Sequence, residues 1–165
     1  MSYKKYYTPP DAIIGLLKFI NPHGKILECC CGKGAISNYL LSKKYDIITN
    51  DIDPSVNADF HFNAKYNWPY LPDIDWVISN PPYGSNEELE ITRKALENAK
   101  HGVAMLLLIS FLEGTIHRKP FHQQHPPNLV IITPRYRFSS GGTYRQTTAW
   151  FVWEKGLLDQ KITWI

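Results

Sequence analysis

The chain has 165 residues and a mass of 19.0 kDa, which suits one domain with a buried core. Hydrophobic residues make up 44% of it and charged residues 20%, which excludes a disordered chain, and a net charge of +3 identifies no polyanionic partner by itself. No apolar run approaches the roughly 20 residues of a membrane-spanning helix and no secretion signal follows Met1, so we expect a single domain over 1–165, in the cytoplasm and not at a membrane.

Helix-like and strand-like segments alternate along the sequence, which predicts an α/β fold with a parallel sheet and crossover helices. Thr8 is expected to cap a first helix that begins with Pro9 and Pro10 and ends at Asn21-Pro22. Further helices are predicted at 35–42 and 86–101, and strands at 25–29, 45–49, 75–79, 103–109, 129–133 and 147–154, the last two as a hairpin. The segments 114–128 and 134–146 are rich in Pro, Gly, His and Arg and are predicted to be loops.

A glycine-rich turn, from Glu28 to Gly34, joins the first predicted strand to the second helix. Its glycines allow a sharp turn and let a ligand approach main-chain N–H groups without a Cβ in the way. The turn lacks the three glycines of a dinucleotide fingerprint and the Gly-Lys-Ser/Thr of a phosphate loop, so it leaves the ligand open. We interpret the three adjacent cysteines, 29–31, as small apolar residues at a strand end.

An acidic residue follows the next predicted strand. Asp51 lies roughly 20 residues beyond the glycine turn, where a carboxylate can accept hydrogen bonds from ribose hydroxyls. Asp53 would point to the same side, but Asp51 is nearer the end of the apolar run, so we favour Asp51. The alternative interpretation is a simple turn cap formed by residues 51–54.

The tetrapeptide Asn80-Pro81-Pro82-Tyr83 ends a strand that is predicted to be buried. An exocyclic amino group is a poor nucleophile because its lone pair is delocalised. The Asn80 side-chain oxygen and the Pro81 carbonyl could accept hydrogen bonds from its N–H groups and stabilise the positive charge that develops on the nitrogen as it attacks. The prolines make the backbone rigid, and Tyr83 offers a flat ring on which a planar substrate can stack. An ordinary proline turn is the alternative, which the preceding glycine turn and acid disfavour.

With these motifs in this order, the sequence resembles the Rossmann-like S-adenosylmethionine-dependent methyltransferases, most closely the gamma-type enzymes that methylate adenine N6 in DNA. The resemblance implies a three-layer fold with a mostly parallel seven-stranded sheet and a closing antiparallel strand. It implies S-adenosyl-L-methionine as cofactor and a catalytic role for Asn80, Pro81, Pro82 and Tyr83. The cofactor-binding residues that it implies are Tyr7, Thr8, Pro9, Glu28, Cys30, Gly32, Gly34, Asp51, Ile52 and Asn63. The family often has an acid where Asn63 stands, and Asp59 is an alternative.

Between Glu113 and Arg145 the only acidic residue is Glu113 itself, while five residues are basic. This excess suits a polyanionic partner, although a solvated basic face would have the same composition. The candidate phosphate contacts are Arg118, Lys119, Arg135, Arg137 and Arg145. Phe138 resembles the aromatic residue that holds an extruded base in the family, and a core position is its alternative.

The expected partner is therefore nucleic acid, DNA in the first place, with the target base swung out of the helix. Methyltransferases of RNA bases and of protein glutamine share the tetrapeptide, and a non-catalytic cofactor-binding subunit is a third hypothesis. Because no part of the sequence is large enough for a separate target-recognition domain, specificity is expected from loops, a homodimer or another subunit. No metal is expected, since His117, His122 and His125 have no convincing further ligand and this methyl transfer needs none.

Overall fold

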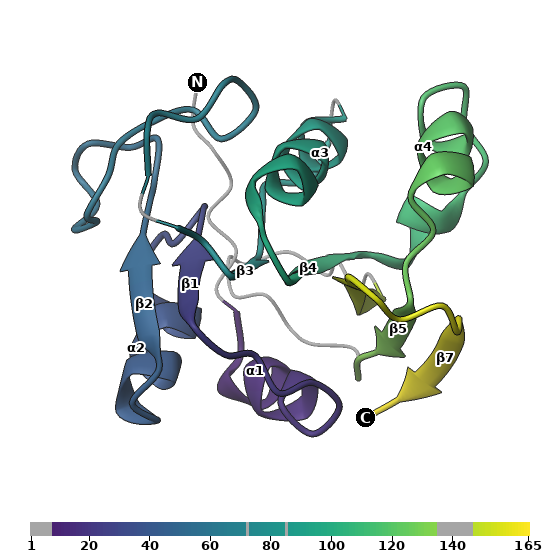
Figure 1. Ribbon diagram of the computed structural model, residues 1–165, viewed down its shortest axis with the longest axis horizontal. Coiled ribbons are helices and arrows are strands. Elements are labelled where there is room, and N and C mark those ends of the chain that lie inside the picture. The colour runs from purple at the N-terminus through teal and green to yellow at the C-terminus, as the bar shows by residue number, and fades with distance from the viewer. Residues whose placement is uncertain (1–7, 72, 85, 135–146) are drawn as a thin grey trace.

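A single β-sheet lies between two layers of helices in the computed structural model, which describes residues 8–71, 73–84, 86–134 and 147–165 (Figure 1). The strands are β1 (Lys25–Glu28), β2 (Asp46–Thr49), β3 (Trp76–Ser79), β4 (Gly102–Leu108), β5 (Leu129–Ile132), β6 (Thr148–Glu154) and β7 (Lys161–Trp164). The helices are α1 (Pro10–Leu16), α2 (Ala35–Ser42), α3 (Glu87–Asn98), the 3₁₀ helix η1 (Ile109–Leu112) and α4 (Arg118–Gln124). No helix of these described ranges is both long and apolar enough to span a membrane.

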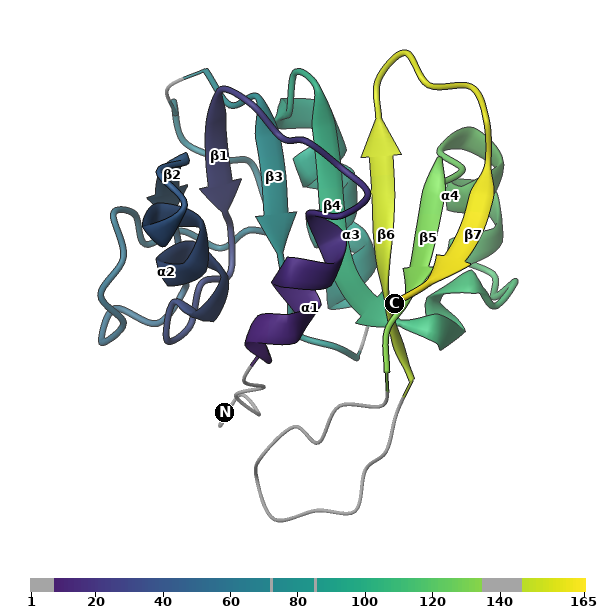
Figure 2. The same ribbon diagram turned by 90° about the horizontal axis from the view of Figure 1, so that it is seen from below.

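The sheet has seven strands in the order β2-β1-β3-β4-β6-β5-β7. Strands β1 to β4 pair in parallel, and β6 runs antiparallel to both of its neighbours, β4 and β5 (Figure 2). The predicted fold class, a mostly parallel seven-stranded sheet with one antiparallel strand, is confirmed, and so is the hairpin of β5 and β6. The antiparallel strand lies inside the sheet, between β4 and β5, and the short strand β7 forms an edge of the sheet, parallel to β5.

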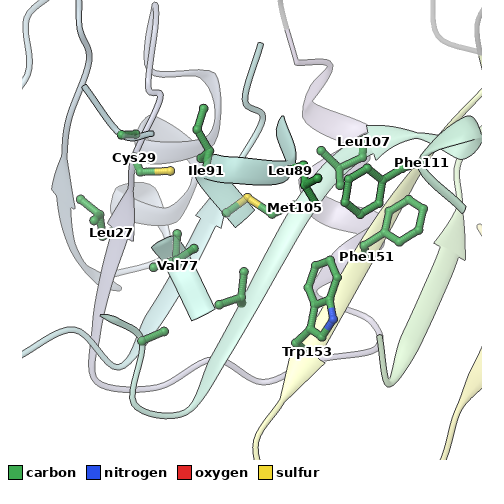
Figure 3. Packing of buried hydrophobic residues seen from close by; sticks show 14 of the residues in the cluster. Leu27, Cys29, Val77, Leu89, Ile91, Met105, Leu107, Phe111, Phe151 and Trp153 are labelled. Atoms are coloured by element: carbon green, nitrogen blue, oxygen red, sulfur yellow. The ribbon is translucent and has the colours of Figure 1, made fainter. Parts of the chain in front are cut away.

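Alternation of side chains along the strands divides the core into two clusters, one on each face of the sheet. On one face Ile26 and Trp76 pack with residues of α1 and α2. On the other face Leu27, Val77 and Met105 pack with residues of α3 and with aromatic side chains from η1 and β6 (Figure 3). Phe121 of α4 belongs to the same cluster. Burial on both faces explains the consecutive apolar residues 26–27 of β1, 76–78 of β3 and 103–108 of β4.

Two expectations about helices were wrong. Pro9, not Thr8, is the N-cap residue of α1 and no side chain caps this helix, because the buried Thr8 hydroxyl bonds to another segment. The segment 114–128, predicted as a loop, contains α4. This helix has seven residues and only Phe121 among them is buried, so its apolar periodicity is too short to detect.

The carboxyl ends of β1 to β4 lie at one edge of the sheet because these strands are parallel (Figure 2). The glycine turn follows β1, residues 50–53 follow β2, the tetrapeptide follows β3 and η1 follows β4. Ligands of open parallel sheets bind beyond this edge. The fold therefore collects the sequence motifs where a site is expected.

Close packing at the opposite edge yields a stability prediction. A Cβ at Gly102 would lie 2.5 Å from ring atoms of the fully buried Trp76. We expect Gly102→Ala to lower the free energy of unfolding by about 1–3 kcal/mol, measured by urea denaturation. Gly114→Ala is the control, since its Cβ would meet no heavy atom within 4 Å; equal losses in both variants would contradict the packing explanation.

Candidate functional site

Four main-chain N–H groups of the glycine turn are already bonded within the protein. A phosphate-binding loop instead aims free N–H groups at its ligand. The donor–acceptor pairs are Cys30 N to Ser79 Oγ (3.1 Å), Cys31 N to Asn50 O (2.9 Å), Gly32 N to Asp51 Oδ2 (2.8 Å) and Gly34 N to Cys31 O (2.8 Å). These four N–H groups are therefore not available to bind a phosphate group of a ligand.

The two glycines of the turn have different reasons to be glycine. Both have positive φ, +51° at Gly32 and +75° at Gly34. A Cβ at Gly34 would approach the Ser37 hydroxyl and the Asn38 amide to 3.1 Å, whereas a Cβ at Gly32 would meet nothing within 4 Å. The surface above Gly32 is therefore open to a ligand, while Gly34 is required by local packing and conformation.

Glu28, the last residue of β1, is buried beneath the turn. Its Oε2 accepts the Ser37 N–H of the first turn of α2 at 2.8 Å, and it thereby supplies the acceptor that a side chain at the N-cap, Gly34, would otherwise provide. Burial raises the pKa of the Glu28 carboxyl well above its usual range. The structure gives Glu28 a helix-capping contact, and its contact with a cofactor stays a prediction.

The cysteines beside this carboxyl are free thiols, and the pKa is lowered at Cys29, where the hydrogen bond with Cys30 has the largest effect, but raised at Cys30 and Cys31. Burial raises the pKa of Cys31 to about 12, and the charges of Glu28 and Asp51 add to that rise. The same two carboxyl groups also raise the pKa of Cys30, after the larger effects of its hydrogen bond with Cys29 and of burial. The Asp51 carboxylate, which bonds to the turn, disfavours a bound anion beside it and favours a bound cation.

The Asp51 carboxylate lies against the glycine turn. Its Oδ2 accepts from Gly32 N of the glycine turn, and its Oδ1 accepts from Asp53 N at 2.9 Å. Asp51 therefore contacts the glycine turn and also caps the turn formed by residues 51–54. The Asp53 carboxylate instead accepts from the N–H and hydroxyl of Ser55. Beside Asp51 the side chain of Ile52 is 44% exposed and offers an apolar surface at the same edge.

The two residues considered for an acidic position near the cofactor adenine have structural contacts. The Asn63 side-chain oxygen accepts the Lys65 N–H at 3.1 Å. The exposed Asp59 carboxylate binds both the N–H and the hydroxyl of Thr49 at 2.8 Å, on the edge strand β2. Asp59 is thus bound to the edge strand, and the role of Asn63 stays a prediction.

The Asn80 side chain of the tetrapeptide is held on both sides. Its Nδ2 donates to Thr8 Oγ1 at 2.9 Å, and its Oδ1 accepts from the Tyr83 hydroxyl at 2.6 Å. The Tyr83 hydroxyl also lies 3.1 Å from the Leu106 carbonyl oxygen, and its half-buried ring packs against the apolar cluster of that face. The structure therefore fixes the orientation of the Asn80 amide, joins the N-terminal motif to the tetrapeptide, and leaves ring stacking by Tyr83 as a prediction.

Few of the predicted nucleic-acid contacts can be placed. Lys119 is exposed, whereas the Arg118 guanidinium donates to Glu88 Oε1 at 2.7 Å and to the Ser110 carbonyl at 2.8 Å. Tyr7, Arg135, Arg137, Phe138 and Arg145 lie outside the described residues. Within the described part of the chain, no three His, Cys, Asp or Glu side chains gather as metal ligands.

Sequence reasoning missed three polar residues of the site: Asn50, Ser79 and Glu88. Asn50 and Ser79 are buried immediately before Asp51 and Asn80. The Asn50 amide bonds to the Cys29 carbonyl and to both main-chain groups of Phe62, and so joins the end of β1 to the segment beyond β2. A polar residue in the last position of an apolar strand was the available signal.

No family model matches the sequence, and no curated protein matches it. Solved structures do match: the methyltransferase subunit of a type I restriction-modification system from Streptococcus thermophilus has a TM-score of 0.72 at 16% identity, over 100% of this chain and 48% of that one. The M protein of the type I restriction enzyme EcoKI has a TM-score of 0.70 at 15% identity, over 91% and 44%. A protein from Pyrococcus horikoshii, PH0226, has a TM-score of 0.59 at 13% identity, over 87% and 88%. The chain spans about half the length of the two type I proteins, and it has the fold of Rossmann-like methyltransferases.

Proposed function

We propose that this chain transfers a methyl group from S-adenosyl-L-methionine to an exocyclic amino nitrogen, and that its substrate is adenine N6 in DNA. The observation that supports this most is the glycine turn, in which four N–H groups are bonded internally beside an open surface at Gly32. A dinucleotide would need these groups for its phosphates, whereas S-adenosyl-L-methionine has a ribose and a positive sulfur but no phosphate.

The residues at this edge fit the proposed cofactor. Each Asp51 oxygen accepts one main-chain N–H, and its remaining lone pairs suit ribose hydroxyls. Ile52 offers an exposed apolar surface for the adenine ring, and the acidic surroundings of the turn favour the positive charge. The cofactor supplies an electrophilic methyl group.

Asn80 is the proposed acceptor for the substrate amine. Its Oδ1 accepts one bond from Tyr83 and has a second lone pair for an amine N–H, and the Pro81 carbonyl is the second proposed acceptor. Because Thr8 holds the Asn80 Nδ2, the amide needs little reorganisation when charge develops on the nitrogen. The nitrogen forms its bond to the methyl carbon as the carbon–sulfur bond breaks, and it then releases one proton to water.

DNA is the proposed partner because the fold matches type I restriction-modification methyltransferase subunits and because Lys119, in α4, is an exposed cation. We also propose that a second copy or another subunit contributes sequence specificity, because the matched Streptococcus thermophilus protein is one subunit of a type I restriction-modification system.

The primary test is transfer of isotopically labelled methyl to DNA, followed by digestion to nucleosides and identification of the modified nucleoside by mass. We expect N6-methyladenine with the unaltered chain. Asn80→Ala should lower kcat about 100-fold or more with little change in cofactor Kd, because it removes an acceptor used when charge develops. Label in RNA or protein alone, or in DNA without adenine, would overturn the proposed substrate.

Asp51 is tested by cofactor binding, measured by calorimetry. Asp51→Ala should raise the Kd for S-adenosyl-L-methionine about 10- to 100-fold, because hydrogen bonds to a charged group contribute about 1.5–3 kcal/mol. Asp53→Ala is the matched control, since that carboxylate bonds to Ser55. Tight binding of NAD, or equal effects of the two variants, would contradict the assignment.

Thr8 has two possible roles that a pair of variants separates. If Thr8 acts by orienting Asn80, Thr8→Val should lower kcat about 3- to 10-fold, the effect of one hydrogen bond, and leave the cofactor Kd unchanged. Thr8→Ser should retain activity because it keeps the hydroxyl. A rise in cofactor Kd with unchanged kcat would assign Thr8 to the cofactor instead.

A further inference from the structure

A buried ion pair between Glu88 and Arg118 is hydrogen-bonded to the residue that follows the tetrapeptide. Glu88, in the first turn of α3, uses both carboxylate oxygens: Oε1 accepts from Arg118 Nη2 at 2.7 Å, and Oε2 accepts from Gly84 N at 3.1 Å. The side chains of Glu88 and Arg118 are only 5% and 16% exposed. Gly84 is the residue that follows Tyr83. The Glu88 carboxylate therefore bonds both to the residue that follows the tetrapeptide and to the Arg118 guanidinium.

Arg118 connects this carboxylate to a third segment. Its Nη1 donates to the Ser110 carbonyl of η1 at 2.8 Å, and its guanidinium lies 5.4 Å from the centre of the Phe111 ring. Because η1 follows β4, one side chain of α4 bonds to both segments that leave β3 and β4 at the site edge. With both terminal nitrogens bonded inside the protein, this guanidinium is poorly placed to bind a phosphate.

The backbone at Gly84 explains why this anchor matters. Gly84 has a φ of +111°, and Asn86, the N-cap of α3, has a φ of +59° and makes no side-chain capping bond. The turn from the tetrapeptide into α3 therefore uses unusual conformations without the usual cap. The bond from Gly84 N to Glu88 holds this turn, and Arg118 neutralises the buried charge that the bond requires.

We propose that Arg118 and Glu88 are positioning residues that hold Tyr83 and Asn80 in place through Gly84, and that Arg118 is not a phosphate contact. The part of this inference that concerns catalysis rests on the proposed methyl transfer. The part that concerns the Gly84 contact is independent of it.

The test is a double-mutant cycle with two readouts, amide hydrogen exchange at Gly84 and the kinetics of methyl transfer to DNA. Arg118→Met leaves a buried unpaired carboxylate, and we expect faster exchange at Gly84 and a kcat lowered about tenfold or more, with cofactor Kd unchanged. Adding Glu88→Gln removes the stranded charge but keeps an oxygen for the Gly84 N–H. The double variant should therefore recover both slow exchange and most of the kcat.

Two controls separate positioning from other roles. Lys119→Met removes the exposed neighbouring cation and should raise KM for DNA and weaken its salt dependence without changing exchange at Gly84. Glu97→Gln breaks the exposed ion pair with Lys94 on the same helix and should change neither readout.

The inference is overturned if Arg118→Met behaves as Lys119→Met does, or if adding Glu88→Gln brings no recovery. A loss of cofactor binding that parallels the loss of kcat would also overturn it, because it would indicate general unfolding. If the unaltered chain transfers no methyl group, the proposed function fails, and exchange at Gly84 alone still decides whether the ion pair holds this turn.

Discussion

The hydrogen bond from the Gly32 amide to the Asp51 carboxylate is the contact on which the site depends. It joins the turn after β1 to the end of β2. It is one of four hydrogen bonds in which N–H groups of the turn donate to acceptors within the protein. A buried N–H without an acceptor would cost about 1–3 kcal/mol, so strand-end acceptors are needed wherever the turn is closed. These internal bonds have a chemical consequence: the N–H groups of Cys30, Cys31, Gly32 and Gly34 are not available to a ligand at this edge.

Electrostatics point in the same direction as hydrogen bonding. A site that binds phosphates combines free N–H groups, a helix N-terminus and cations. Here an N–H group at the start of α2, that of Ser37, donates to Glu28 Oε2. Asp51 is a second carboxyl group beside the turn. The internal bonds of the glycine turn and the Asp51 carboxylate beside it both disfavour a polyphosphate at this edge. The distinction comes from acceptors that face the turn and not from the number of glycines.

The sequence predicted the elements that depend on local pattern. Strands β1 to β6 and helices α2 and α3 are apolar or amphipathic over enough residues to be recognised, and the glycine turn, Asp51 and Asn80 lie at strand ends as expected. Features that depend on distant contacts were not predicted. The partner of Thr8 is 72 positions away and that of Arg118 is 30 positions away, so Thr8 suggested a helix cap and Arg118 a surface cation. The strand β7 escaped for another reason: it has four residues at an exposed edge, where little burial imposes a pattern.

The tetrapeptide shows how these long-range contacts produce a rigid site. A proline pair restricts only its own backbone, and it fixes neither the amide of Asn80 nor the turn after Tyr83. Those are held by Thr8 before α1, by the Leu106 carbonyl of β4, and by the Glu88–Arg118 pair of α3 and α4. Each contact comes from a different element, so the geometry at Asn80 depends on packing of helices on both faces of the sheet. Small rearrangements of α1 or α4 should therefore alter the orientation of these side chains, because Thr8 lies just before α1 and Arg118 is the first residue of α4.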